Sequence, residues 1–104
     1  MSKNMTDEEL VEAVAREVLF YKGDIHSKRP IFLLHLKEKW AWMPFSDMND
    51  LQMVKDKFDD YEIRYRKGLY DVCIFHIRGV YGATRITETR AWLEAALAAK
   101  RGEV

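Results

Sequence analysis

Three histidines and one cysteine are the residues that could bind a soft metal ion or carry nucleophilic chemistry: His26, His35, His76 and Cys73. The histidines do not pair at the i,i+4 spacing of one helix face, and the chain has neither a CxxC nor an HExxH motif. A site built from His35 and His76 would need their two segments to be adjacent strands. We therefore expect no metal site and no cofactor.

The other candidates for catalysis have simpler structural roles. Cys73 lies in an apolar strand segment, where a buried thiol behaves as a small hydrophobic side chain. Ser46 is placed to cap a helix, and Asp59 with Asp60 ends one. The chain has no phosphate-binding loop and no GxSxG motif. The sequence predicts that this protein is not an enzyme and has no catalytic residues.

The composition excludes some classes of protein. The 104 residues predict one domain, 1–104, and a hydrophobic content of 48% is too high for a disordered chain. The 17 basic and 17 acidic residues cancel, which argues against a duplex-binding protein. A single cysteine, no apolar run long enough to span a bilayer and no secretory signal predict a cytoplasmic protein.

A three-stranded antiparallel meander is predicted over residues 61–86. Apolar and polar residues alternate at its start, and Lys67-Gly68 forms the first turn. The second strand, about residues 70–78, is apolar on both faces, which predicts a central strand covered on two sides. If helices cover both faces of the sheet, Tyr61, Ile63 and Tyr65 face a helix. Arg64 and Arg66 then pair with acidic residues of the helices.

Helices are predicted over residues 6–21, 47–58 and 88–101. Thr6 with Glu9 is a capping-box pattern, Ser46 or Asp47 caps the second helix, and Thr87 caps the third. Residues 31–43 are predicted as a β-ribbon with its tip at residues 37–39, although a buried helical turn would also fit. The fold class is α+β: an α-β-α sandwich with helices packed on the meander, in the order α-(β-ribbon)-α-β-β-β-α.

Two segments resemble a known family. They are PFSD-M-x-x-L-x-x-V at residues 44–54 and GATRITETRAWLEAAL at residues 82–97. With the order of elements, they resemble the phage ABA sandwich domain family of small phage and prophage proteins. The resemblance implies an α-β-α fold, a phage origin and a place in the bacterial host cell, and it supplies no catalytic residues. Residues 20–43 look longer and more apolar than the family's usual connection, so no family binding surface carries over there.

Two groups of residues could bind a partner protein. The first group includes Trp40 and Trp42 of the predicted ribbon. Alternate tryptophans on a strand share one face, so this group is a core cluster if the ribbon is covered and a binding patch if it projects. The second group is a basic rim on the meander. The candidate partner-binding residues are Trp40, Trp42, Met43, Phe45, Arg64, Arg66 and Lys67.

The sequence thus favours a non-enzymatic phage or prophage accessory protein that binds a host or phage protein, for example to inhibit a host defence machine. The first alternative is a small RNA- or DNA-binding module that uses basic and tyrosine side chains of the sheet. The second is a homodimer of unknown role that pairs through an exposed strand edge.

Overall fold

The computed structural model describes residues 5–23, 25–26, 29–34, 38–77 and 79–102, with the backbone alone at residues 26, 32–34 and 38–40. Within them the elements are α1 (Asp7–Glu17), β1 (Ile25–His26), β2 (Arg29–Leu34), β3 (Glu38–Ala41), α2 (Met48–Lys55), β4 (Tyr61–Arg66), β5 (Leu69–His76), β6 (Gly79–Arg85) and α3 (Glu88–Arg101). The α+β class and the predicted order of helices and meander strands are confirmed.

Side-chain caps start all three helices of the described chain. The Thr6 hydroxyl accepts a hydrogen bond from the Glu9 amide at 3.1 Å, and the Glu9 carboxylate accepts one from the Thr6 amide at 2.8 Å. Asp47 accepts from the Asn49 amide, and Thr87 accepts from the Arg90 amide. Helix α1 ends before the expected residue 21, because Phe20 adopts a left-handed conformation with φ of 57°.

The meander is held by continuous antiparallel pairing. Strand β4 pairs with β5 from Tyr61 opposite Ile74 to Arg66 opposite Leu69, and β5 pairs with β6. Lys67 and Gly68 join β4 to β5 with φ of 51° and 81°. Two positive φ angles define the tight turn whose twist matches a two-stranded hairpin.

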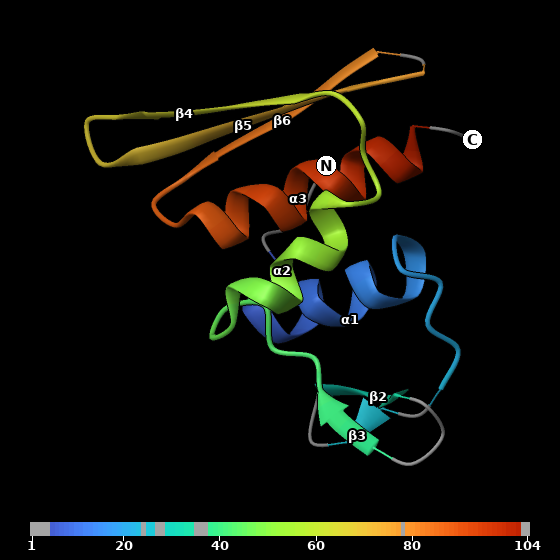
Figure 1. Cartoon of the computed structure of the whole chain (residues 1–104). Coiled ribbons are helices and arrows are strands. Elements are labelled where there is room, and N and C mark those ends of the chain that lie inside the picture. The colour runs from blue at the N-terminus through green and yellow to red at the C-terminus, as the bar shows by residue number, and fades with distance from the viewer. Residues whose placement is uncertain (1–4, 24, 27–28, 35–37, 78, 103–104) are drawn as a thin grey trace.

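Helix α3 lies in the middle of the molecule. Figure 1 shows the meander along one side of α3, and α1 and α2 on the other. Val72 and Ile74 point from β5 toward α3 and are fully buried, as is Trp92 on the helix. The ring of Tyr61 packs edge-on against Trp92, with their centroids 4.6 Å apart, so Tyr61 faces the helix as expected.

The prediction that β5 is covered on both sides is wrong. All three helices lie on one side of the meander, so its other face remains exposed (Figure 1). Phe75 on that face is 37% exposed, and its cross-strand partner Val80 is 61% exposed. Cys73 is half-buried there and not in the core. We call this face, which points away from α3, the open face.

The predicted two-stranded ribbon is present as β2 and β3, and β1 adds a third strand to form a smaller sheet. Strand β2 pairs with β3 from Ile31 opposite Ala41 to Leu34 opposite Glu38. Glu38 therefore lies in a strand and not at a hairpin tip, and residue 37 of the predicted tip is outside the described residues. Figure 1 places β2 and β3 beyond α1, at the end of the molecule opposite the meander.

The turn at Gly68 generates a stability prediction. A Cβ at Gly68 would meet no atom within 4 Å, so Gly68→Ala tests the positive φ without a steric clash. We expect a loss of about 1 kcal/mol in the free energy of unfolding, measured in urea. Lys67→Asn is the matched control, because asparagine tolerates this conformation, and it should lose nothing. Equal losses in both variants would contradict the assignment.

The ion pair between α1 and α3 generates a pH prediction. Arg101 donates to both carboxylate oxygens of Glu17 at 2.9 and 3.0 Å, which lowers the pKa of Glu17 below its ordinary value of 4.5. A lowered carboxyl pKa stabilises the fold above the ordinary pKa, and this contribution disappears as pH falls through the lowered one. Because both side chains are partly exposed, Glu17→Gln should cost only about 0.5 kcal/mol at neutral pH.

The free energies of unfolding of the wild type and of Glu17→Gln should be measured in urea from neutral pH into acid. The two values should converge below the ordinary carboxyl pKa. Arg101→Met should reproduce the Glu17→Gln curve, and the double variant should lose no more than either single variant. A Glu17→Gln deficit that persists in acid would show that the pair is not its cause.

Candidate functional site

The structure separates the candidate partner-binding residues into two locations. Met43 and Phe45 border a cleft between α1 and the start of α2, whereas Arg64, Arg66 and Lys67 lie at one end of the meander. None of the described contacts joins the two groups. Trp40 contributes its backbone to β3, and its side chain lies outside the described part of the chain.

Trp42 must be removed from the set of partner-binding residues. Its side chain is fully buried, and its indole Nε1 donates to the backbone oxygen of Asp50 at 2.9 Å. The Asp50 carboxylate accepts from the Met43 amide at 2.8 Å, which fixes the chain against α2. Of the two alternatives left open by the sequence, Trp42 is therefore a core residue.

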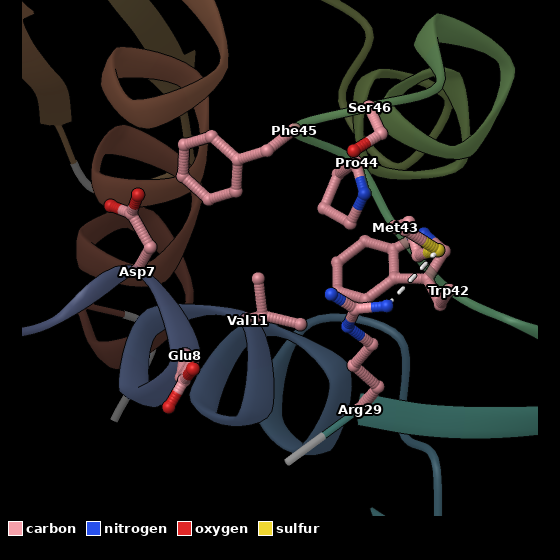
Figure 2. A pocket seen from close by; sticks show the side chains of 9 residues that line it. All are labelled: Asp7, Glu8, Val11, Arg29, Trp42, Met43, Pro44, Phe45 and Ser46. Atoms are coloured by element: carbon pink, nitrogen blue, oxygen red, sulfur yellow. Dashed lines mark hydrogen bonds between the residues drawn. The ribbon is translucent and has the colours of Figure 1, made fainter. Parts of the chain in front are cut away.

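The cleft has an apolar floor and a charged rim. Figure 2 shows Asp7, Glu8 and Val11 entering it from α1, and residues 42–46 forming the other side. Arg29 reaches across the opening, where its Nη1 atom lies 3.7 Å from the sulfur of Met43. No motif or spacing singles out Arg29 in the sequence, because Arg29 meets Met43 only after β2 has folded back on residue 43.

The size of the cleft limits what it can bind. Its volume is about 160 Å³, whereas pockets for cofactors and drug-sized ligands hold about 300–1,000 Å³. The cleft therefore suits a single side chain from a partner better than a small-molecule ligand. Phe45, 37% exposed at the rim, could contact the same partner.

The basic rim does not pair with the helices as expected. Arg64 Nη2 lies 3.3 Å from Glu62 of the same strand, and more than half of each side chain is exposed. Arg66 and Lys67 are also exposed. Arg64 and Arg66 alternate with the residues that face α3, so they lie on the open face, together with Glu62 and Asp71. The rim is therefore of mixed charge.

Apolar residues at the other end of the open face were missed as candidates. Phe75 and Val80 form a cross-strand pair, and Ile77 just beyond β5 is 83% exposed. The signal was present in the sequence as the second apolar face of β5. We interpreted it as coverage by a helix, because a strand pattern cannot tell a covered face from an uncovered one.

The geometry places the tyrosines and the arginines of β4 on opposite faces of the sheet. Tyr61 and Tyr65 lie on the α3 side of β4, and Arg64 and Arg66 lie on the open face. Single-stranded nucleic acid is bound by aromatic and basic side chains that share one surface. On the α3 side, Arg85 does share a face with Tyr65 and Tyr70, but it forms an ion pair with Glu94 of α3 at 2.6 Å, so its charge is already matched within the chain.

The reactive side chains are dispersed. Burial, followed by the nearby Asp71 and Glu62 carboxylates, raises the pKa of the Cys73 thiol, which keeps it protonated and weakly nucleophilic. His76 packs against Phe58 with ring centroids 5.4 Å apart. His35 lies outside the described residues, and the side chain of His26 is not described. Among the described residues, no three histidine, cysteine, aspartate or glutamate side chains gather as a metal site would require.

The comparisons with known proteins identify a fold. The chain is similar to the crystal structure of a phage protein from Bacillus cereus ATCC 14579, with a TM-score of 0.71 over 95% of this chain and 96% of that chain. The chain has the fold of a phage protein. The sequence identity is 19%, so the similarity extends to the fold and not to individual residues. No family model and no curated protein matches the chain.

None of the described helices is long and apolar enough to cross a bilayer.

The two buried tryptophans generate a matched stability prediction. Both are fully buried, but Trp42 Nε1 has an acceptor and Trp92 Nε1 has no hydrogen-bond partner among the described residues. Phenylalanine removes similar volume at each site, so the hydrogen bond should decide the difference. Trp42→Phe should therefore cost about 1–2 kcal/mol more than Trp92→Phe in chemical denaturation. Equal losses would mean that the bond to Asp50 contributes nothing.

Proposed function

We propose that this chain is a phage or prophage protein that works by binding another protein in the bacterial cytoplasm, and that it is not an enzyme. The observation that carries the proposal is the apolar end of the open face. Phe75, Ile77 and Val80 remain 37%, 83% and 61% exposed although the chain has a core that could bury such side chains. Large apolar side chains left exposed together are typical of interaction surfaces.

The open face has the composition of a protein-binding surface. Phe75 and Val80 would supply the apolar contact, and the mixed charges of Glu62, Arg64 and Asp71 would form a polar rim beside it. The proposal keeps Arg64 and Arg66 from the sequence prediction and replaces the tryptophans by the apolar residues of the open face. The cleft beside Phe45 is a secondary contact that would accept one partner side chain.

The fold similarity to a phage protein supports the phage origin, and membership of the phage ABA sandwich domain family is part of the same proposal. A phage protein without catalytic residues acts on the cell through what it binds. We infer a host protein as the partner, such as a component of a defence machine that the phage protein inhibits. This choice of partner rests on the proposed origin and not on a particular residue.

Nucleic-acid binding is the weaker alternative. The net charge of the chain is zero, and acidic Glu62 and Asp71 share the open face with the arginines. Both facts oppose the counterion release that drives binding to phosphates.

The test is affinity capture from lysate of a bacterial host with tagged wild-type protein and two variants. Phe75→Glu combined with Val80→Glu should abolish recovery of a stoichiometric protein partner. Phe20→Glu should retain it, because Phe20 is 62% exposed but follows α1, on the side of α3 away from the meander (Figure 1). Thermal unfolding of each variant checks that the fold is intact.

Two results would overturn the proposal. One is recovery of no partner by the wild type. The other is recovery of nucleic acid with an affinity that falls steeply with salt and is lost in Arg64→Ala with Arg66→Ala, which would favour the nucleic-acid alternative.

A further inference from the structure

No strand or helix of the described residues covers the outer edge of strand β4. The order β4-β5-β6 places it at the side of the meander, and all six of its residues are exposed. Helix α3 packs mainly against β5 and β6, and the ring contact of Tyr61 with Trp92 joins the start of β4 to the helix. The strand contains neither a proline nor a bulge, two of the devices that proteins use to block edge pairing. A third device is charge, and Glu62, Arg64 and Arg66 admit a second strand only where its charges are complementary.

The pattern of hydrogen bonds between β4 and β5 shows which backbone groups of β4 are available at this edge. The Phe75 amide donates to the Asp60 carbonyl at 3.0 Å, one position before the ladder of β4 with β5. In an antiparallel ladder, residues that bond inward alternate with residues whose groups point away. Asp60 bonds inward, so the backbone groups of Tyr61, Ile63 and Tyr65 point outward.

The charges along the strand are complementary to themselves in the reverse direction. Residues 59–67 read Asp-Asp-Tyr-Glu-Ile-Arg-Tyr-Arg-Lys, acidic before Ile63 and basic after it. When two copies run antiparallel with Ile63 opposite Ile63, Glu62 faces Arg64, Asp60 faces Arg66 and Tyr61 faces Tyr65. Each of these pairs occurs twice by symmetry, and each joins side chains of the same face.

The neighbouring registers lack this match. A change of register keeps the outward backbone groups opposite each other only if one strand moves by two residues, or a multiple of two, along the other. Centring the pair on Glu62 keeps Asp60 opposite Arg64 but sets two glutamates against each other. Centring it on Arg64 keeps Glu62 opposite Arg66 but sets two arginines against each other. Like charges directly opposite destabilise a strand pair. The β6 edge offers no such pattern, because Gly79–Arg85 carries a single charge at one end.

We propose that two copies of this chain pair through their β4 edges, antiparallel and centred on Ile63. The backbone groups of Tyr61, Ile63 and Tyr65 then bond to the same residues of the second copy. Glu62 and Arg64, which lie 3.3 Å apart within one chain, gain a second opposite charge across the two-fold axis. The two meanders become one sheet, and both open faces lie on the same side of it.

Charge reversal tests the register. We expect the wild type to dimerise in a concentration-dependent manner by sedimentation velocity. Arg64→Glu alone or Glu62→Arg alone should weaken the dimer about tenfold or more, because each change places like charges opposite each other twice. The double variant Glu62→Arg with Arg64→Glu should recover dimerisation. Thr84→Lys, on the β6 edge, is the control and should leave the dimer unchanged.

Disulfide trapping tests the same geometry independently. Facing residues that exchange both hydrogen bonds have Cα atoms about 5.5 Å apart, within the range that a disulfide can bridge. In a Cys73→Ser background, Ile63→Cys should cross-link with itself under mild oxidation. Tyr65→Cys alone should not, but it should cross-link when mixed with Tyr61→Cys.

A wild type that stays monomeric at millimolar concentration would overturn the proposal. So would a dimer that the charge reversals leave unchanged, or cross-linking of Tyr65→Cys with itself in place of Ile63→Cys. Phe75→Glu with Val80→Glu leaves the β4 edge intact, so the dimer and the partner-binding proposal can fail separately.

Discussion

The burial of α3 on two sides is the interaction on which the rest of this structure depends. Apolar residues extend around well over half of its circumference at 3.6 residues per turn, from Ala91 and Ala95 through Trp92 to Leu93 and Leu97, and all five are buried. A helix with so wide an apolar surface needs a partner layer on each side. The meander provides one layer, and α1 with α2 provides the other.

The alanines of α3 explain why both layers can approach closely. Ala95, Ala96 and Ala99 are fully buried and add little width to the helix, so large side chains from its neighbours can fill the space. Trp92 is the exception, and it is contacted by Tyr61 from β4 and by the ammonium of Lys55, 5.6 Å from its ring, from α2. One indole thus connects the sheet to the opposite helical layer.

Sequence predicted the features that are set by local chemistry. Thr6, Asp47 and Thr87 each cap a helix through a side chain that reaches an amide two or three residues away, so no distant contact is needed. The turn at Gly68 is local in the same sense. The layer order was not predictable in this way, because the apolar second face of β5 is compatible with either a covering helix or an exposed surface. The candidate site was unpredictable for the same reason, because it depends on contacts between distant segments. Trp42 is a core residue because it bonds to Asp50 of α2, and Arg29 lies at the cleft because β2 folds back toward Met43.

The position of the small sheet bears on how such a protein can change through evolution. Strands β2 and β3 lie at one end of the molecule and the meander at the other, with the helices between them (Figure 1). Because β2 packs on α1 and α1 on α3, a change in the described part of residues 25–41 reaches the meander through these helices and not by direct contact. The segment can therefore lengthen or acquire new side chains while the geometry of the open face is preserved. The small sheet and the open face can therefore change independently of each other.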